Sequence, residues 1–318
     1  MSDYNEIIDV HCHLFNAKYM LMELAAFGWN YMRGDYPHQK KSLGKRVERR
    51  GIISELEGFK DLVVHISKFI KAVLSDCDEN YMTLIREFDE SKLGQGNSII
   101  IAPLMMDIYF SLYDNKDEEE AGKSGRRTTP VIEAFVIPEN QKADFDDYLQ
   151  YLKNVIKEEI ETQPSVTGRR SISGKEIDSI FQDIGKELAD GDKSSRRSCN
   201  YDGIELSPGY KKHMEDLEEL CKKYPDRIFP FLAVDPRRKG IMDLIEKKVG
   251  DGSGMFKGIK IYTPLGYLPT HPDLKPVFEY CSKHDIPVTT HCSKGGMPNF
   301  RKKNYVSSWI KGDNSHWE

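Results

Sequence analysis

The sequence is poor in the features that mark membrane, secreted and nucleic-acid-binding proteins. It has no apolar stretch long enough to span a membrane. The first apolar run is short and carries Asp9 and His11, which is unlike a signal peptide. Its 46 basic residues are outnumbered by 51 acidic ones, whereas a dedicated nucleic-acid binder is usually basic. We therefore expect neither a membrane nor a nucleic-acid partner.

Cysteine is scarce and scattered. The sequence contains no Cys-x-x-Cys pair and no spacing typical of a disulfide framework; its six cysteines are Cys12, Cys77, Cys199, Cys221, Cys281 and Cys292. This usage is typical of reduced thiols and predicts a cytoplasmic protein. With 318 residues, of which 39% are hydrophobic, the chain can form one large domain with insertions or two domains.

A short apolar run near the N-terminus, from Ile7 to His13, ends in His-Cys-His. A strand places alternate residues on one face, so His11 and His13 should point the same way, with Asp9 below them. Two neutral imidazoles suit zinc or a related divalent metal. A surface strand that happens to carry two histidines is the alternative, and a metal site would need further ligands elsewhere in the chain.

Five strands are predicted in all, separated by helical patterns. One is nearly continuous apolar, as expected for a strand that is covered on both faces. After Tyr210, strands and helices alternate at roughly thirty-residue spacing, which is typical of βαβ units in a parallel sheet. The predicted strands are residues 7–13, 98–106, 228–234, 256–262 and 286–291.

Besides the strand that carries His11 and His13, two of these strands have polar residues where parallel α/β enzymes keep their chemistry. In the fourth, Lys260 and Tyr262 alternate with isoleucines and should point inward. A buried lysine must be paired, modified or functional, unless the face is reversed and Lys260 is solvated. His291 ends the fifth strand and is either a third metal ligand or a hydrogen-bonded structural residue. Tyr262 and Tyr267 are candidate substrate contacts, with packing as the alternative.

Residues 108–207 interrupt this regular pattern. Helical faces predict helices at about 144–161 and 175–189, and Ser173 with Glu176 predicts a capping box for the second. An earlier helical pattern that includes Met20 should close near Gly28. We interpret residues 108–207 as a helical insertion into one domain that spans residues 1–318.

Four segments together resemble the amidohydrolase superfamily, in its amidohydrolase-related branch, which includes aminocarboxymuconate-semialdehyde decarboxylase-like enzymes. They are Ile8-Asp9-Val10-His11-Cys12-His13, Phe231-Leu232-Ala233-Val234-Asp235-Pro236-Arg237, Gly258-Ile259-Lys260-Ile261-Tyr262 and Thr290-His291-Cys292-Ser293. Their order matches as well. The resemblance covers roughly residues 1–107 and 208–318, and it leaves the insertion out.

The resemblance implies an α/β fold, a TIM-like (β/α)₈ barrel that binds one or two divalent metal ions, most commonly zinc. His11, His13 and His291 fall on metal-ligand positions. Lys260 falls where some members carry a carboxylated lysine that bridges two metals, while other members bind one metal without such a bridge. Both arrangements remain open for this chain.

The implied activity is hydrolysis of a small-molecule amide, ester or lactone by metal-activated water. The alternative enzymatic activity is non-oxidative decarboxylation of a small carboxylic acid. A second alternative is that the chain is not an enzyme but a non-catalytic barrel fragment. The family also uses a histidine after strand six and an aspartate after strand eight. With five predicted strands, we expect an incomplete barrel with residues 286–291 at an open edge, and a catalytic aspartate beyond Glu318. A homo-oligomer is compatible with this interpretation.

Overall fold

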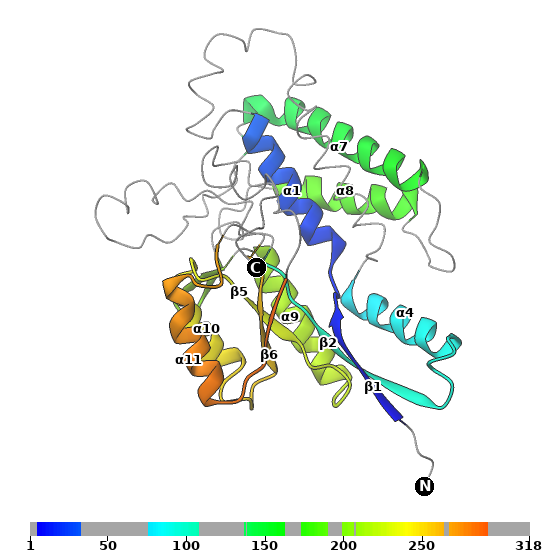
Figure 1. Cartoon of the computed structure of the whole chain (residues 1–318). Helices are drawn as coiled ribbons and strands as arrows, with labels where there is room; N and C mark the ends of the chain where they lie inside the picture. The colour runs from blue at the N-terminus through cyan, green and yellow to red at the C-terminus, as the bar shows by residue number, and fades with distance from the viewer. Residues whose placement is uncertain are drawn as a thin grey trace, which may run out of the picture. The chain divides into compact units, whose positions relative to one another are not determined.

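The computed structural model describes residues 5–32, 76–107, 137, 139–162, 173–189, 199–206, 208–263 and 267–291. The chain divides into two compact units (Figure 1). Unit 1 consists of Met1–Phe15, Cys77–Ile132 and Ser198–Glu318, and unit 2 consists of Asn16–Asp76 and Glu133–Arg197.

Unit 1 is built on parallel strands, at the positions that the sequence predicts. They are β1 (Asn5–Cys12), β2 (Asn97–Pro103), β5 (Phe231–Val234), β6 (Gly258–Ile261) and β7 (Val288–Thr290). β1 pairs with β2, and β5, β6 and β7 form a second set in that order. Two parallel bridges, Ile101 to Ile228 and Leu104 to Phe231, connect β2 to β5. The spatial order therefore follows the chain, and unit 1 is an α/β unit with parallel strands.

Helices connect these strands, and a small hairpin stands apart from them. The helices of unit 1 are α4 (Cys77–Glu90), α9 (Pro208–Lys223), α10 (Ile241–Lys248), the 3-10 turn η3 (Pro272–Leu274) and α11 (Lys275–Lys283). α10 lies between β5 and β6 in the chain, and α11 lies between β6 and β7, as βαβ units require. The hairpin pairs β3 (Cys199–Tyr201) with β4 (Ile204–Leu206) in an antiparallel sheet of their own.

The central strand β6 is buried along its whole length and has a neighbouring strand on each side. Ile259 and Ile261 alternate with Lys260, and all three are fully or almost fully buried. Gly258 lies opposite Phe231 of β5. A Cβ atom at Gly258 would come within 2.5 Å of the Phe231 ring, so the absence of a side chain lets that ring pack across β6.

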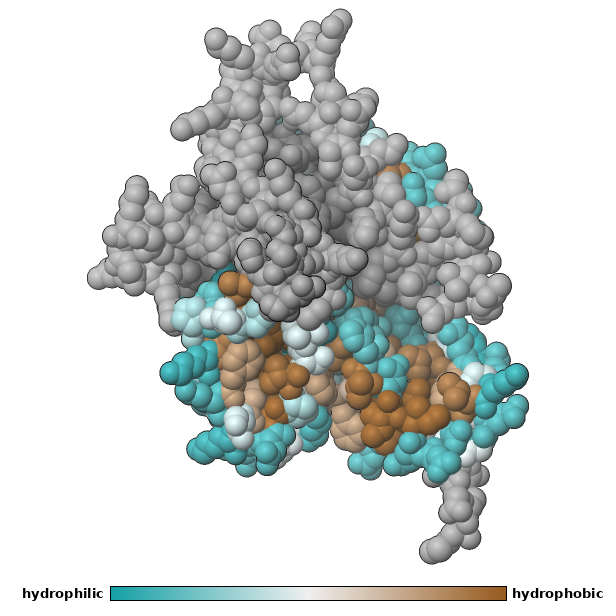
Figure 2. Space-filling model, in the orientation of Figure 1, coloured by the Kyte–Doolittle hydropathy of each residue, from teal (hydrophilic) through white to brown (hydrophobic). Residues whose placement is uncertain are grey.

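The two outermost strands leave apolar side chains on the surface. On β1, Ile8 is 60% exposed and Val10 is 62% exposed, and Val288 on β7 is 39% exposed. Figure 2 shows the hydrophobic surface over β1 and β2. Within the described ranges, β1 pairs only with β2 and β7 pairs only with β6, so these strands do not close into a barrel.

Unit 2 is helical in the residues described. It contains α1 (Ala17–Met32), the 3-10 turn η1 (Glu139–Gln141), α7 (Lys142–Thr162) and α8 (Gly174–Ala189). The helices predicted at about 144–161 and 175–189 are therefore confirmed, whereas α1 continues past Gly28 to Met32. The predicted capping box is present: Ser173 N–H donates to Glu176 at 2.7 Å, and Glu176 N–H donates to the Ser173 hydroxyl at 3.3 Å.

An aromatic cluster joins the helices of unit 2. The ring of Trp29 on α1 meets Phe145 edge-on at 5.1 Å and lies 5.7 Å from Tyr148, both on α7. On the surface, Lys157 of α7 forms an ion pair with Asp178 of α8 at 2.8 Å. None of the helices described in either unit is long and apolar enough to cross a membrane.

Candidate functional site

The three histidines that the sequence singles out lie together at the ends of β1 and β7. The ring centre of His11 is 5.4 Å from that of His13 and 6.5 Å from that of His291. Two imidazoles bound to one zinc ion have ring centres roughly 5 Å apart. The His11–His13 distance is close to that value, and the His11–His291 distance is about 1.5 Å longer.

β1 is irregular where it carries these side chains. Its pairing with β2 shifts between Asp9 and Cys12, and there the Asp9 carboxylate accepts the backbone N–H of His11 at 2.9 Å. Such bulges re-aim side chains at the ends of strands. His11 is exposed and His13 is half-buried. The imidazole of His11 can therefore be reached from solvent, while that of His13 lies deeper.

The tautomer of His13 follows from its hydrogen bond. Nδ1 of His13 lies 2.8 Å from the carbonyl oxygen of Leu104, and a carbonyl only accepts, so Nδ1 carries the proton. The lone pair is then on Nε2, which is free to bind a metal, as is typical of histidine ligands anchored by a carbonyl. Burial lowers the pKa of His13 to about 4, and the nearby His11, Lys260 and His291 act in the same direction. His13 is therefore neutral at pH 7.

Lys260 is fully buried and lies close to this histidine cluster. Burial lowers the pKa of His291, and Lys260 lowers it further, as it does that of His13. The lysine side chain thus lies on the interior side of β6, as the alternation with Ile259 and Ile261 predicts, and is not solvated. Its role as a metal ligand stays a prediction.

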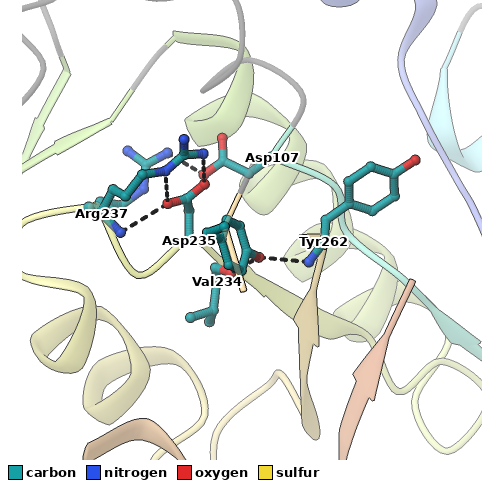
Figure 3. Close-up of polar contacts among 7 residues, drawn as sticks. Asp107, Val234, Asp235, Arg237 and Tyr262 are labelled. Atoms are coloured by element: carbon teal, nitrogen blue, oxygen red, sulfur yellow. Dashed lines mark hydrogen bonds and ion pairs between the residues drawn. The ribbon is translucent and has the colours of Figure 1, made fainter. Parts of the chain in front are cut away.

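Tyr262 follows β6 directly and contacts the third histidine. Its ring stacks on that of His291, with ring centres 4.6 Å apart and planes inclined by 29°. Burial raises the pKa of Tyr262. Figure 3 shows the Tyr262 ring directed away from the carboxylates of Asp107 and Asp235. This predicted substrate contact therefore lies against the histidine cluster.

Tyr267, the other predicted substrate contact, is 2% exposed. Its hydroxyl donates to the carbonyl of Val234 at 3.0 Å and accepts the backbone N–H of Tyr262 at 2.7 Å (Figure 3). Burial raises its pKa well above the ordinary value for tyrosine. The hydroxyl is thus used within the protein, where it connects the ends of β5 and β6.

Two ion pairs, one half-buried and one buried, lie at the ends of β2 and β5. Asp235 binds the Arg237 guanidinium through two contacts of 2.8 and 2.6 Å and accepts the Arg237 backbone N–H at 2.9 Å (Figure 3). Asp107 pairs with Arg238, which also lies 4.5 Å over the ring of Tyr210. Burial lowers the pKa of Arg238, but Asp107, Tyr210 and Asp235 together raise it above its ordinary value. Arg238 therefore stays charged.

His213 of α9 is a buried residue that the sequence analysis did not select. Its Nε2 donates to the carbonyl of Leu14 at 2.8 Å, and its ring lies 4.9 Å from that of Phe15. Burial lowers its pKa to about 4. Cys77 and Asn80 donate to the same stretch, to the Leu14 and Phe15 carbonyls respectively. These contacts fix the chain just after the His-Cys-His segment.

The cluster has the right donor type for zinc, but it is not a formed ligand sphere. Among the residues the structure describes, no group of three or more histidine, cysteine, aspartate or glutamate side chains is arranged to hold a metal ion. The exposed His11 is the ring with most freedom to reorient, while His13 already has the tautomer that a ligand needs. The donor set therefore fits a divalent metal by its chemistry.

Comparison with known proteins adds no relative to these observations. No protein-family model, curated protein or solved structure matches the chain.

Proposed function

We propose that His11, His13 and His291 bind a divalent metal ion, zinc, and that the protein is a metal-dependent hydrolase of a small molecule. The observation that carries this proposal is the cluster of three imidazoles from two separate strand ends. The hydrogen bond to Leu104, which leaves Nε2 of His13 as the donor, supports it. So does the resemblance of the four sequence segments to the amidohydrolase superfamily.

We also propose that the five parallel strands are consecutive strands of a TIM-like (β/α)₈ barrel. Their spatial order follows the chain order, and helices connect β5, β6 and β7. In such barrels the active site lies at the carboxyl ends of the strands, where His13, Tyr262 and His291 are found. Residues 108–207 remain the proposed insertion, and a cytoplasmic location and a homo-oligomer remain expectations.

The residues have separate roles in this proposal. His13 and His291 are held neutral by burial and serve as ligands, and His11 completes the set from the exposed side. When bound, the metal would activate water and polarise the substrate carbonyl. Tyr262 offers an aromatic face to the substrate beside His291. Lys260 is the candidate to bridge a second ion.

Metal binding is the decisive test. Purified wild-type chain is stripped with a chelator and titrated with zinc, followed by elemental analysis of the protein. We expect the wild type to bind zinc and the variants His11→Ala, His13→Ala and His291→Ala each to bind it at least tenfold more weakly. His284→Ala is the matched control, because His284 caps α11 and contacts Tyr280. A wild-type chain that binds no zinc, or binds it equally without these histidines, would refute the proposal.

The reaction class is tested on the zinc-loaded protein. A panel of small esters, lactones and amides is assayed for hydrolysis, and a panel of small carboxylic acids for release of carbon dioxide. Hydrolysis that is lost in His13→Ala supports the hydrolase. Release of carbon dioxide that is likewise lost in His13→Ala supports the decarboxylase. Metal binding without either activity supports the non-catalytic alternative.

A further inference from the structure

The hydroxyl of Tyr267 stands where the direct pairing of β5 and β6 ends. The last paired residues of these strands are Val234 and Ile261. Beyond them the Tyr267 hydroxyl donates to the Val234 carbonyl at 3.0 Å and accepts the N–H of Tyr262 at 2.7 Å. A buried side chain thus supplies the link that the backbone no longer makes, and it fixes the main chain of Tyr262.

The chain that leaves β6 also fixes the main chain of His291. The His291 N–H donates to the Ile261 carbonyl at 3.0 Å, and the Thr263 hydroxyl donates to the His291 carbonyl at 3.1 Å. Neither contact sets the rotation of the imidazole about its last side-chain bond, a torsion with broad preferences. The stacked ring of Tyr262, 4.6 Å away, restricts this rotation.

We propose that Tyr267 is a positioning residue for the His291 imidazole and acts through Tyr262. The hydroxyl of Tyr267 holds the backbone of Tyr262, and the Tyr262 ring then holds the plane of the His291 ring. The importance of this plane rests on the proposed function, because a metal ligand needs a fixed direction for its lone pair.

The surroundings of Tyr267 keep its ring in place for this role. Arg237 lies with its guanidinium 5.4 Å from the centre of the Tyr267 ring. Asp235 binds that guanidinium through two contacts, and Asp235 itself is fully buried. The ion pair at the end of β5 therefore supports the ring from the side, while the two backbone hydrogen bonds orient its hydroxyl.

The chain offers a closely matched control for removing this hydroxyl. Tyr210 is also fully buried, and its hydroxyl donates to the carbonyl of Ala233 at 2.7 Å, one residue before Val234. The Tyr210 hydroxyl thus bonds to β5, and its ring faces the guanidinium of Arg238 at 4.5 Å. Tyr210→Phe and Tyr267→Phe therefore each remove a buried hydroxyl that donates to a β5 carbonyl, but Tyr267→Phe also releases the backbone of Tyr262.

The test uses proton–carbon NMR of the metal-free chain with isotope-labelled histidine. His291 is assigned by its loss in His291→Asn. Tyr262→Leu removes the stacked ring. It therefore gives the chemical shifts of the His291 ring protons in the absence of the tyrosine ring current. In the wild type we expect the His291 ring protons to resonate upfield of their chemical shifts in Tyr262→Leu. In Tyr267→Phe their chemical shifts should move toward those of Tyr262→Leu, and in Tyr210→Phe they should stay at the wild-type values. Tyr262→Phe keeps a stacking ring and should keep the upfield signals.

Zinc affinity provides the second measurement. We expect Tyr267→Phe to weaken zinc binding about tenfold, as is typical when support for a metal ligand is lost, and Tyr210→Phe to leave it unchanged. His291 signals that stay at the wild-type position in Tyr267→Phe would overturn the positioning role. If Tyr267→Phe does not fold, Tyr262→Leu provides the test. His291 signals that stay at the wild-type position in that variant would show that the Tyr262 ring does not stack on His291, which would also overturn the positioning role. The NMR measurement needs no metal, so a wild-type chain without zinc affinity would refute the proposed function alone.

Discussion

The buried ion pair between Asp107 and Arg238 gives the sharpest prediction about stability. The side chain of Asp107 is 2% exposed and that of Arg238 is 4% exposed, so neither charge is screened by water. Asp107→Asn keeps the shape of the side chain but takes away its charge. The guanidinium of Arg238 then stays buried without the carboxylate that it faces.

The expected loss follows from the cost of leaving one charge of a buried pair uncompensated. Such variants lose about 3–5 kcal/mol of folding free energy. We expect the lower part of that range, because Asp235 also lies near Arg238 and the ring of Tyr210 faces its guanidinium. Replacing both partners with apolar residues, in Asp107→Leu with Arg238→Met, removes the buried charges together. That double variant should be close to the wild type in stability.

Urea unfolding followed by circular dichroism measures these differences. Because the chain has two compact units, hydrogen exchange of the amides of β2 and β5 is recorded in parallel to report on unit 1. Glu279→Gln is the control, since its partner Lys275 is 78% exposed and the pair should contribute almost nothing. An Asp107→Asn variant within about 1 kcal/mol of the wild type would refute the reasoning.

Three further predictions concern packing, pH and thiol reactivity. Gly258→Ala should cost about 1–3 kcal/mol in urea unfolding, because the new methyl group would meet the ring of Phe231; an unchanged midpoint would contradict this. The pKa of His213 is about 4 in the folded state and 6.5 in the unfolded state, so between these pH values the unfolded state binds the extra proton. The free energy of unfolding should therefore fall by about 3 kcal/mol as the pH is lowered from 6.5 to 4. His213→Asn should show a smaller fall in pH-dependent melting. Burial raises the pKa of Cys12 and Cys221 to about 12, so iodoacetamide at pH 8 should label them only after unfolding. Rapid labelling of the folded chain in peptide mapping would contradict this.

Much of unit 1 could be predicted because its signals are local. Alternation and short apolar runs located all five parallel strands. The hairpin of β3 and β4 was missed, since each of its strands has three residues and alternation cannot be detected over that length. The end of α1 was also wrong, because Gly28 is buried within the helix and packing there outweighs its poor helix propensity.

The candidate site was predictable only in part, because local patterns indicate where a single side chain points but not which distant residue it contacts. Strand parity placed Lys260 on the interior side of β6 without knowledge of the fold. The partners of the site residues come from distant parts of the chain: the Leu104 carbonyl lies 91 positions from His13, and Arg238 lies 131 positions from Asp107. Sequence periodicity carries no information about such pairs. His213 had a usable signal, because it lies on the same helical face as the buried Tyr210 and Leu217.

The chain leaves unit 1 after Phe15 and returns to it at Cys77, and these two points are neighbours in space. Asn80 donates to the Phe15 carbonyl at 2.9 Å, and the Cys77 thiol contacts the Leu14 carbonyl. When the ends of an inserted stretch are held together, doubling its length costs the host only about 0.6 kcal/mol in closure entropy. This junction is thus a place where evolution could lengthen, shorten or exchange the intervening sequence at little expense to the parallel strands. A protein engineer could use the same junction to shorten the chain with a brief linker.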